Sequence, residues 1–122
     1  MAEVTYHEGP KKKPWEEHLE YLDHLKPVIR LLGEPFVIAG DFNQRIPRVK
    51  GGNRRAAEQL EATFEGADIV TRGVLAGCNR PGIDHIALSS HLRATNVEGW
   101  PNDVNGNRLS DHDGALADVG LA

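Results

Sequence analysis

Apolar residues recur at helical spacing in two parts of the chain, and each part predicts one helix. In the first part they are Trp15, Leu19, Leu22, Leu25, Ile29 and Leu32. This spacing predicts a helix that begins at Pro14, kinks or divides at Pro27 and ends before Gly33. A second helix with one apolar face is expected from an N-cap at Asn53 to Gly66.

Short apolar runs bounded by turn residues predict the strands. They cover residues 4–7, 36–40, 68–71, 83–89, 95–99 and 114–120. Asn105-Gly106 is a turn signal between the last two of these runs. The order strand, helix, strand, helix and several further strands predicts a mixed α/β or α+β sandwich. We expect a mixed sheet and two helices in a single domain over residues 1–122.

The composition is that of a globular protein, because 39% of the residues are apolar and 26% are charged. The 18 acidic residues outnumber the 14 Lys and Arg and give a net charge of −4, which excludes a general nucleic-acid binder. No apolar run predicts a membrane span or a signal peptide. Cys78 is the single cysteine, which excludes an internal disulfide and a cysteine metal site. A cytoplasmic protein is therefore expected.

One apolar run, residues 36–39, ends in Gly40-Asp41-Phe42-Asn43. On an extended chain Asp41 and Asn43 point to the same face, because they are two residues apart. A carboxylate and a carboxamide together at a strand end suit the binding of a phosphate, a metal ion or both. An Asx turn with a structural role alone is the alternative.

Two later stretches carry related chemistry. Asp84 lies in the apolar run 83–88, where a carboxylate is costly to bury unless it is paired. Ser110-Asp111-His112 comes just before the last apolar run. If Asp84 accepts a hydrogen bond from His112, it fixes the tautomer of the ring and favours an imidazolium that stabilises a phosphorane-like transition state. The alternative is that Asp84 binds backbone N–H groups and that His112 caps a helix or turn.

These stretches resemble three signature motifs of the endonuclease/exonuclease/phosphatase superfamily, which has the fold of DNase I. The motifs are Gly40-Asp41-Phe42-Asn43, Ile83-Asp84-His85 and Ser110-Asp111-His112, in the order of the family. The segment Val4–Pro10, followed by a helix, resembles the family segment with another catalytic histidine. This implies that His7 is a general acid or a phosphate contact at the leaving group. The resemblance covers nearly the whole chain.

The activity that the resemblance implies is that of a metal-dependent, nuclease-like hydrolase of phosphodiesters or phosphomonoesters. Water attacks phosphorus in line, and Asp41 polarises or deprotonates that water. Asn43 donates to a phosphate oxygen. His112, oriented by Asp84, contacts the transferring phosphate. Asp111 supplies an oxygen ligand to Mg²⁺ or Mn²⁺.

The chain resembles only the C-terminal half of the family fold, which is a four-layer sandwich built from two similar halves. The asparagine and the metal-binding glutamate of the N-terminal half have no counterpart. We therefore expect weak or absent binding of Mg²⁺ or Mn²⁺ by the isolated chain. A half sandwich also leaves an apolar sheet face uncovered, which predicts self-association or a partner that supplies the N-terminal half. A catalytically silent fragment or interaction module is the alternative.

A basic cluster directly follows Asn43. It consists of Arg45, Arg48, Lys50, Arg54 and Arg55, with no acidic residue between them. Arg45 and Arg48 are candidate contacts for a substrate phosphate. A nucleic acid is one candidate substrate, beside phosphoinositides, sphingomyelin and small phosphate esters. An ordinary solvated loop is the alternative.

The remaining aromatic and histidine residues are expected to have structural or solvated roles. We expect Trp15 to pack in the core. His18 and His24 lie on an acidic helix and are expected to face solvent. His85 and His91 do not combine with Asp84 in any known zinc spacing, so no zinc site is expected.

Overall fold

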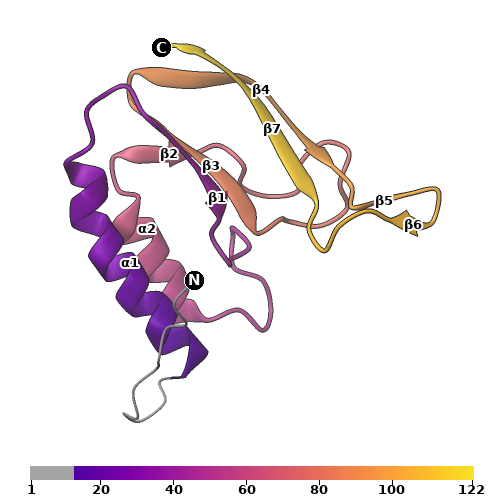
Figure 1. The fold of residues 1–122 in the computed structure, drawn as a ribbon, viewed down its shortest axis with the longest axis horizontal. Helices are drawn as coiled ribbons and strands as arrows, with labels where there is room; N and C mark the ends of the chain where they lie inside the picture. Colours follow the sequence, from indigo (N-terminus) through magenta and orange to yellow (C-terminus); the bar gives the residue numbers. More distant parts are fainter. Residues whose placement is uncertain (1–12) are drawn as a thin grey trace, which may run out of the picture.

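The computed structural model describes residues 13–122, which form two helices and seven strands (Figure 1). In chain order these are α1 (Pro14–Arg30), β1 (Val37–Asp41), α2 (Arg54–Thr63), β2 (Ala67–Ile69), β3 (Asp84–Ser89), β4 (Leu92–Trp100), β5 (Asp103–Val104), β6 (Asn107–Arg108) and β7 (Gly114–Leu121). The two helices and the strands expected after residue 35 are confirmed. The expected strand at residues 4–7 lies outside the described residues.

Helix α1 is stabilised at both ends and is not divided at Pro27. The Glu16 carboxylate accepts a hydrogen bond from the backbone N–H of Lys13 at 3.2 Å, and Arg30 lies in the last turn, where a cation favours the helix dipole. Pro27 also lies close to this end of the helix. Its carbonyl still accepts from the N–H of Leu31 at 3.2 Å. The proline therefore removes one hydrogen bond near the terminus, where the loss does not end the helix.

All strand pairings among residues 13–122 are antiparallel. Strand β3 lies between β1 and β2 in a three-stranded sheet, β4 pairs with β7, and β5 pairs with β6. The β5–β6 turn has Asn105 at φ 53° and Gly106 at φ 81°, as a tight hairpin of this kind requires. The fold is therefore α+β with two helices, and the mixed sheet that we expected is not found in this part of the chain. The four-layer sandwich stays a prediction.

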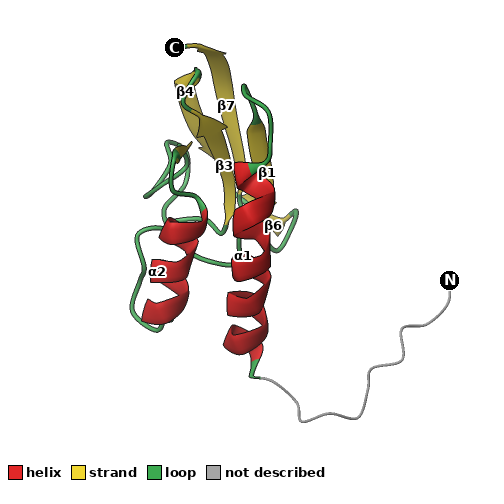
Figure 2. Ribbon diagram, turned by 90° about the vertical axis from the view of Figure 1, so that its left-hand side faces the viewer, coloured by secondary structure: helices red, strands yellow, loops and turns green. Residues whose placement is uncertain are grey.

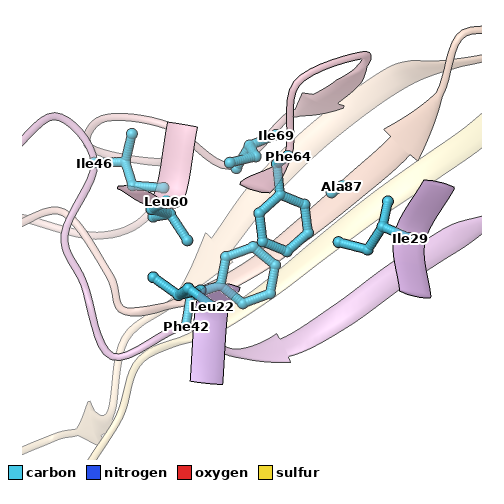
Figure 3. Close-up of a cluster of buried hydrophobic side chains, with 8 residues drawn as sticks. All are labelled: Leu22, Ile29, Phe42, Ile46, Leu60, Phe64, Ile69 and Ala87. Atoms are coloured by element: carbon cyan, nitrogen blue, oxygen red, sulfur yellow. The ribbon is translucent and has the colours of Figure 1, made fainter. Parts of the chain in front are cut away.

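The core lies between the two helices and one face of the three-stranded sheet. The helices run side by side below this sheet (Figure 1, Figure 2). Figure 3 shows the buried cluster, which consists of Leu22, Ile29, Phe42, Ile46, Leu60, Phe64, Ile69 and Ala87. The rings of Phe42 and Phe64 stack with their centroids 4.7 Å apart. Because Phe42 follows the last residue of β1, this stacking fixes the end of the strand against α2.

Side chains alternate between the two faces of β3, so the core residues and Asp84 lie on opposite faces. His85 and Ala87 are buried, and Ala87 belongs to the core cluster between the sheet and the helices. Asp84 precedes His85 and therefore faces the opposite side of the sheet, as the sequence predicted. The sheet thus holds a carboxylate on the face that the helices do not cover.

Several large apolar side chains are exposed on the strands. Val37 of β1, Trp100 of β4 and both Val119 and Leu121 of β7 are among them. The self-association or partner that we expected from such a surface stays a prediction. Within residues 13–122, neither helix has the length and apolar character needed to cross a membrane.

Candidate metal and phosphate site

Two carboxylates lie side by side where β1 and β3 pair for the last time. Asp41 is the register partner of Asp84, and the N–H of Phe42 donates to the carbonyl of Ile83 at 2.9 Å just beyond them. Directly opposed residues in an antiparallel pair share one face of the sheet, and like charges in this arrangement destabilise it. The fold therefore keeps an unfavourable pair that a cation or a protonated base would compensate.

His112 approaches these carboxylates from the loop before β7. Its Nδ1 lies 2.8 Å from Oδ2 of Asp84, so the expected hydrogen bond between the two residues is present. Both side chains are half-buried. With Nδ1 donating to the carboxylate, Nε2 is the ring nitrogen left for another contact.

Asp41, Asp84 and His112 together can hold a metal ion. One ligand atom from each lies within 4.8 Å of the others. Two carboxylate oxygens and an imidazole nitrogen suit a divalent ion such as Mn²⁺ or Zn²⁺, whereas Mg²⁺ favours a shell of oxygen alone. Three protein ligands also leave coordination positions for water and a phosphate oxygen. The residues present therefore fit a divalent cation, without fixing which one.

Asp111, which we expected to be the metal ligand, lies apart from this group. Its carboxylate pairs with Nη2 of Arg108 at 3.0 Å, and its side chain is 85% exposed. Arg108 lies three residues away at the end of β6, so the contact is local. Asp41, which we expected to activate the attacking water, lies beside Asp84 and His112 instead, and metal binding by Asp111 stays a prediction. The cause is the β1–β3 register, which motif spacing alone does not give.

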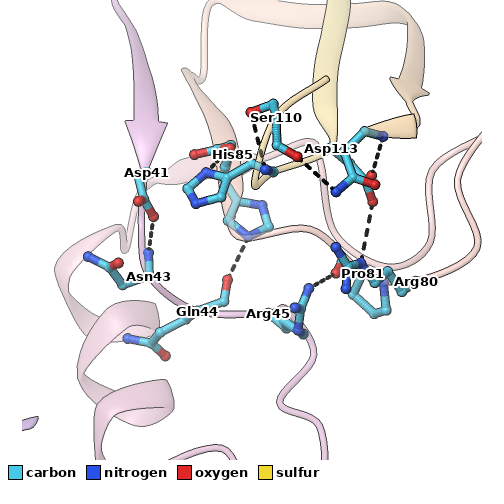
Figure 4. A network of polar contacts seen from close by, with 12 residues as sticks. Asp41, Asn43, Gln44, Arg45, Arg80, Pro81, His85, Ser110 and Asp113 are labelled. Carbon is cyan, nitrogen blue, oxygen red and sulfur yellow. Dashed lines mark hydrogen bonds and ion pairs between the residues drawn. The ribbon is translucent and has the colours of Figure 1, made fainter. Parts of the chain in front are cut away.

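The backbone at Asn43 is not extended, so Asn43 does not continue strand β1. Strand β1 ends at Asp41, and Asn43 has φ 56°, in the left-handed region that asparagine tolerates. Its backbone N–H donates to Oδ1 of Asp41 at 2.8 Å (Figure 4). The expectation of alternation from residue 41 to residue 43 was therefore wrong. The Asx-type turn that stood as the alternative is present, and it holds the Asp41 carboxylate at the strand end.

Asp113 fixes the loop that carries His112. Its side chain is 9% exposed, its Oδ1 accepts from the N–H of Asn102 at 2.8 Å, and its Oδ2 lies 3.6 Å from Nε of Arg80. The guanidinium of Arg45 donates to the neighbouring Pro81 carbonyl. Figure 4 shows these contacts beside the site. Asp113 has no role in the sequence-based prediction, although a carboxylate directly before an apolar strand was a signal for it.

His85 is a structural residue beneath the site. Its Nε2 donates to the carbonyl of Gln44 at 2.8 Å, and its Nδ1 lies 2.7 Å from Oγ1 of Thr71, which itself accepts from the N–H of Ile86. The Thr71 hydroxyl therefore donates to Nδ1. Burial lowers the pKa of His85, although the hydrogen bond to Gln44 raises it. The ring is neutral, and both of its nitrogens are occupied.

His18 was expected in solvent, and this was wrong. The amide of Gln44 donates to Nε2 of His18 at 2.8 Å and to the carbonyl of Ala56 at 3.1 Å. Burial lowers the pKa of His18, and the nearby Asp41 carboxylate raises it. His18 is therefore neutral and links α1 to the loop after Asn43. No signal in the sequence gave this contact, because the burial of Gln44 is visible only in the folded chain.

The basic residues lie on the loop that follows Asn43. Arg45 is half-buried through its contact with Pro81, and Arg48 is exposed and donates from Nη1 to the carbonyl of Gly52 at 3.3 Å. Neither contacts the Asp41–Asp84–His112 group directly. His7, the expected group at the leaving oxygen, lies outside the described residues.

Comparisons of the chain with models of protein families, with characterised proteins and with solved structures find no match.

Proposed function

We propose that this chain is a metal-dependent, nuclease-like hydrolase of phosphate esters. One observation carries the proposal: ligand atoms of Asp41, Asp84 and His112 come together within 4.8 Å from three separate stretches of sequence. The same stretches resemble the signature motifs of the endonuclease/exonuclease/phosphatase superfamily. A structural role alone gives no reason for two carboxylates to oppose each other at a strand end, because that arrangement costs stability.

Each residue has a role that its position supports. Asp41 is exposed and accepts a proton from the water that attacks phosphorus, while its other oxygen stays bound to the N–H of Asn43. Asp84 holds Nδ1 of His112, so Nε2 is the one ring nitrogen left for either the metal ion or a phosphate oxygen. When the two carboxylates hold the metal ion, Nε2 would contact the phosphate. A bound divalent ion would neutralise the phosphate and the charge that develops on it.

The displacement breaks the bond between phosphorus and the leaving oxygen, which then takes up a proton. The resemblance gives this step to His7. Water supplies the new oxygen on phosphorus, so that a phosphodiester yields a phosphomonoester and an alcohol. No redox partner is needed.

Three protein ligands are few for Mg²⁺ or Mn²⁺, so we expect weak binding by the isolated chain. A partner with the N-terminal half of the fold would complete the four-layer sandwich and supply the missing ligands, whereas a second copy of the chain would only cover the exposed apolar face. The exposed apolar side chains on β1, β4 and β7 support such an association.

Hydrolysis of bis(p-nitrophenyl) phosphate and nicking of supercoiled DNA would test the proposal, with Mn²⁺, with Mg²⁺ and with chelator. We expect turnover that requires the metal and that His112→Ala lowers by about a hundredfold or more. The matched control is His91→Ala, because His91 is an exposed histidine that pairs only with Glu34 among the described residues. Turnover that persists in chelator, or that survives His112→Ala, would contradict the proposal.

A catalytically silent interaction module is the second candidate. The pairing of Asp111 with Arg108 favours it, because this contact removes one carboxylate from the metal site. Titration with Mn²⁺, followed by electron paramagnetic resonance, separates the two. No saturable Mn²⁺ binding in the millimolar range, together with no turnover, would establish the silent module.

A further inference from the structure

A cavity of about 280 Å³ lies beside the proposed catalytic group. The loop that starts at Asn43 forms one wall, and the beginning of α1 and the approach to β3 form the others. The lining residues that matter are Trp15, Asn43, Arg45, Arg48, Lys50 and Ile83. Neither the family resemblance nor the proposed mechanism gives this cavity a role.

Positive charge on the cavity wall has no carboxylate to balance it. No acidic residue occurs from 42 through 57, although the whole chain has a net charge of −4. Arg45 and Arg48 donate to backbone carbonyls, and Lys50 forms no ion pair with any residue from 13 to 122. Arg54, by contrast, is paired with Glu58 at 3.2 Å. The three cations on the wall are therefore available to an anion.

An aromatic ring faces the same cavity. Trp15 is half-buried and meets the ring of His18 edge to face, with the centroids 5.4 Å apart and the planes at 73°. It does not belong to the core cluster, contrary to the expected core packing. An anchored indole and the apolar side chain of Ile83 beside several cations form a surface suited to a base and its phosphate. An inorganic anion alone would gain nothing from the indole.

Two residues that line the cavity are directly joined to residues of the proposed catalytic group. Asn43 lines the cavity, and its N–H donates to Asp41. Ile83 also lines the cavity and directly precedes Asp84. A polymer with one phosphate at the Asp41–Asp84–His112 group would therefore have its neighbouring nucleotide at the cavity.

We propose that this cavity binds one nucleotide of a single-stranded nucleic acid, next to the phosphate that is hydrolysed. Arg45, Arg48 and Lys50 contact the phosphate, and the base stacks on Trp15. A single strand is required because the bases of a duplex already stack on one another. This inference rests on the proposed function, whose substrate class it names.

Binding of a short fluorescein-labelled oligothymidylate to the full chain, measured by fluorescence anisotropy in chelator, tests the inference without turnover. We expect Arg48→Ala and Lys50→Ala each to weaken binding and to lower the slope of log affinity against log salt by about 0.7, the value for one lost phosphate contact. Trp15→Leu should weaken binding about tenfold and leave this slope unchanged. Trp15→Phe should restore part of the affinity.

Arg93→Ala is the matched control, because Arg93 is an exposed arginine on β4 that does not line the cavity. Circular dichroism would show that each variant is folded. Equal weakening by Arg93→Ala, tighter binding of a duplex than of the single strand, or no binding at all would overturn the inference. An oligouridylate arm shows whether RNA binds as DNA does, and equal binding supports recognition through phosphate and base stacking.

The inference and the proposed function fail in different ways. Hydrolysis of bis(p-nitrophenyl) phosphate without oligonucleotide binding would overturn the inference alone. Oligonucleotide binding with no metal-dependent hydrolysis would contradict the proposed function and leave a nucleic-acid binding cavity.

Discussion

Asp41 and Asp84 are register partners at the last paired position of β1 and β3, and the imidazole of His112 lies 2.8 Å from the second of them. Two like charges at directly opposed positions oppose strand pairing by up to about 1 kcal/mol. A site that costs stability when empty and gains it when a cation binds is typical of functional residues.

The first prediction concerns Asp41→Asn. The amide retains an oxygen that can accept from the N–H of Asn43, but the charge opposite Asp84 is gone. We expect the free energy of unfolding in chelator to rise by about 0.5 kcal/mol, while metal-dependent hydrolysis falls at least a hundredfold. Urea denaturation and the phosphodiester assay measure the two effects. Asp118→Asn is the control, because Asp118 is an exposed strand carboxylate opposite Asn96. A loss of stability in Asp41→Asn would contradict the account of charge repulsion.

The second prediction separates Asp113 from its neighbour Asp111. Asp113→Ala removes the nearly buried carboxylate that accepts a hydrogen bond from the N–H of Asn102. This change should lower the free energy of unfolding by about 1–2 kcal/mol. It should also weaken Mn²⁺ binding by roughly tenfold, because the loop that carries His112 loses its anchor. Asp111→Ala removes only an exposed ion pair, so its unfolding free energy should change by less than about 0.5 kcal/mol. Loss of Mn²⁺ binding in Asp111→Ala alone would show that Asp111 is the metal ligand and would contradict the assignment to Asp41.

The third prediction is a dependence of stability on pH. Burial lowers the pKa of His85 below 6.5, the value expected in the unfolded chain. As the pH falls below 6.5, the unfolded state therefore takes up a proton that the folded state does not, and stability declines. The contribution is complete above 6.5 and is lost toward the lower pKa of the folded state.

Urea denaturation in chelator on both sides of pH 6.5 measures this effect. His85→Gln should reduce the slope of stability against pH, and His91→Gln, at an exposed position, serves as the control. His18, whose pKa burial also lowers, contributes in the same direction, so part of the slope should remain in His85→Gln. A free energy of unfolding that rises as the pH falls below 6.5 would contradict the lowered pKa of His85 and His18.

The fourth prediction concerns two glycines that let the loop before β3 pack on β4. A Cβ on Gly77 would lie 2.6 Å from the carbonyl oxygen of Gly99, and Gly77 has φ 95°. A Cβ on Gly99 would lie 2.5 Å from Sγ of Cys78. We expect Gly77→Ala and Gly99→Ala each to lose about 1–3 kcal/mol of unfolding free energy. Gly33→Ala, at a position with open space and no left-handed backbone, should be nearly neutral in the same urea titration.

Much of the fold followed from the sequence because its cues are local. Helical spacing and caps gave α1 and α2, and apolar runs gave β1, β3 and β7. The consequence of Pro27 was overestimated, because a proline close to the end of a helix removes a bond that the terminus can lose. The absence of parallel pairing could not be predicted, since strand direction depends on how connections cross the sheet.

Only part of the site could be predicted, because contacts between residues that are distant in the sequence bring it together. The pairing of Asp84 with His112 was expected from motif resemblance, and it is present. Which of two acidic residues joins them depends on the β1–β3 register and on the contact between Arg108 and Asp111. Neither is visible in motif spacing. Trp15 and His18 were misplaced because an apolar stripe shows which side of a helix is buried, but not which distant loop covers its first turns.

Gln44 anchors the start of the loop that follows Asn43, whereas residues 48–52 lie farther along the same loop. Its side chain binds α1 through His18 and α2 through the carbonyl of Ala56, and its own carbonyl binds His85. These contacts are made at the start of the loop, and none of them involves residues 48–52. On the proposed function, sequence changes at residues 48–52 would alter substrate preference and leave the contacts of Gln44 intact.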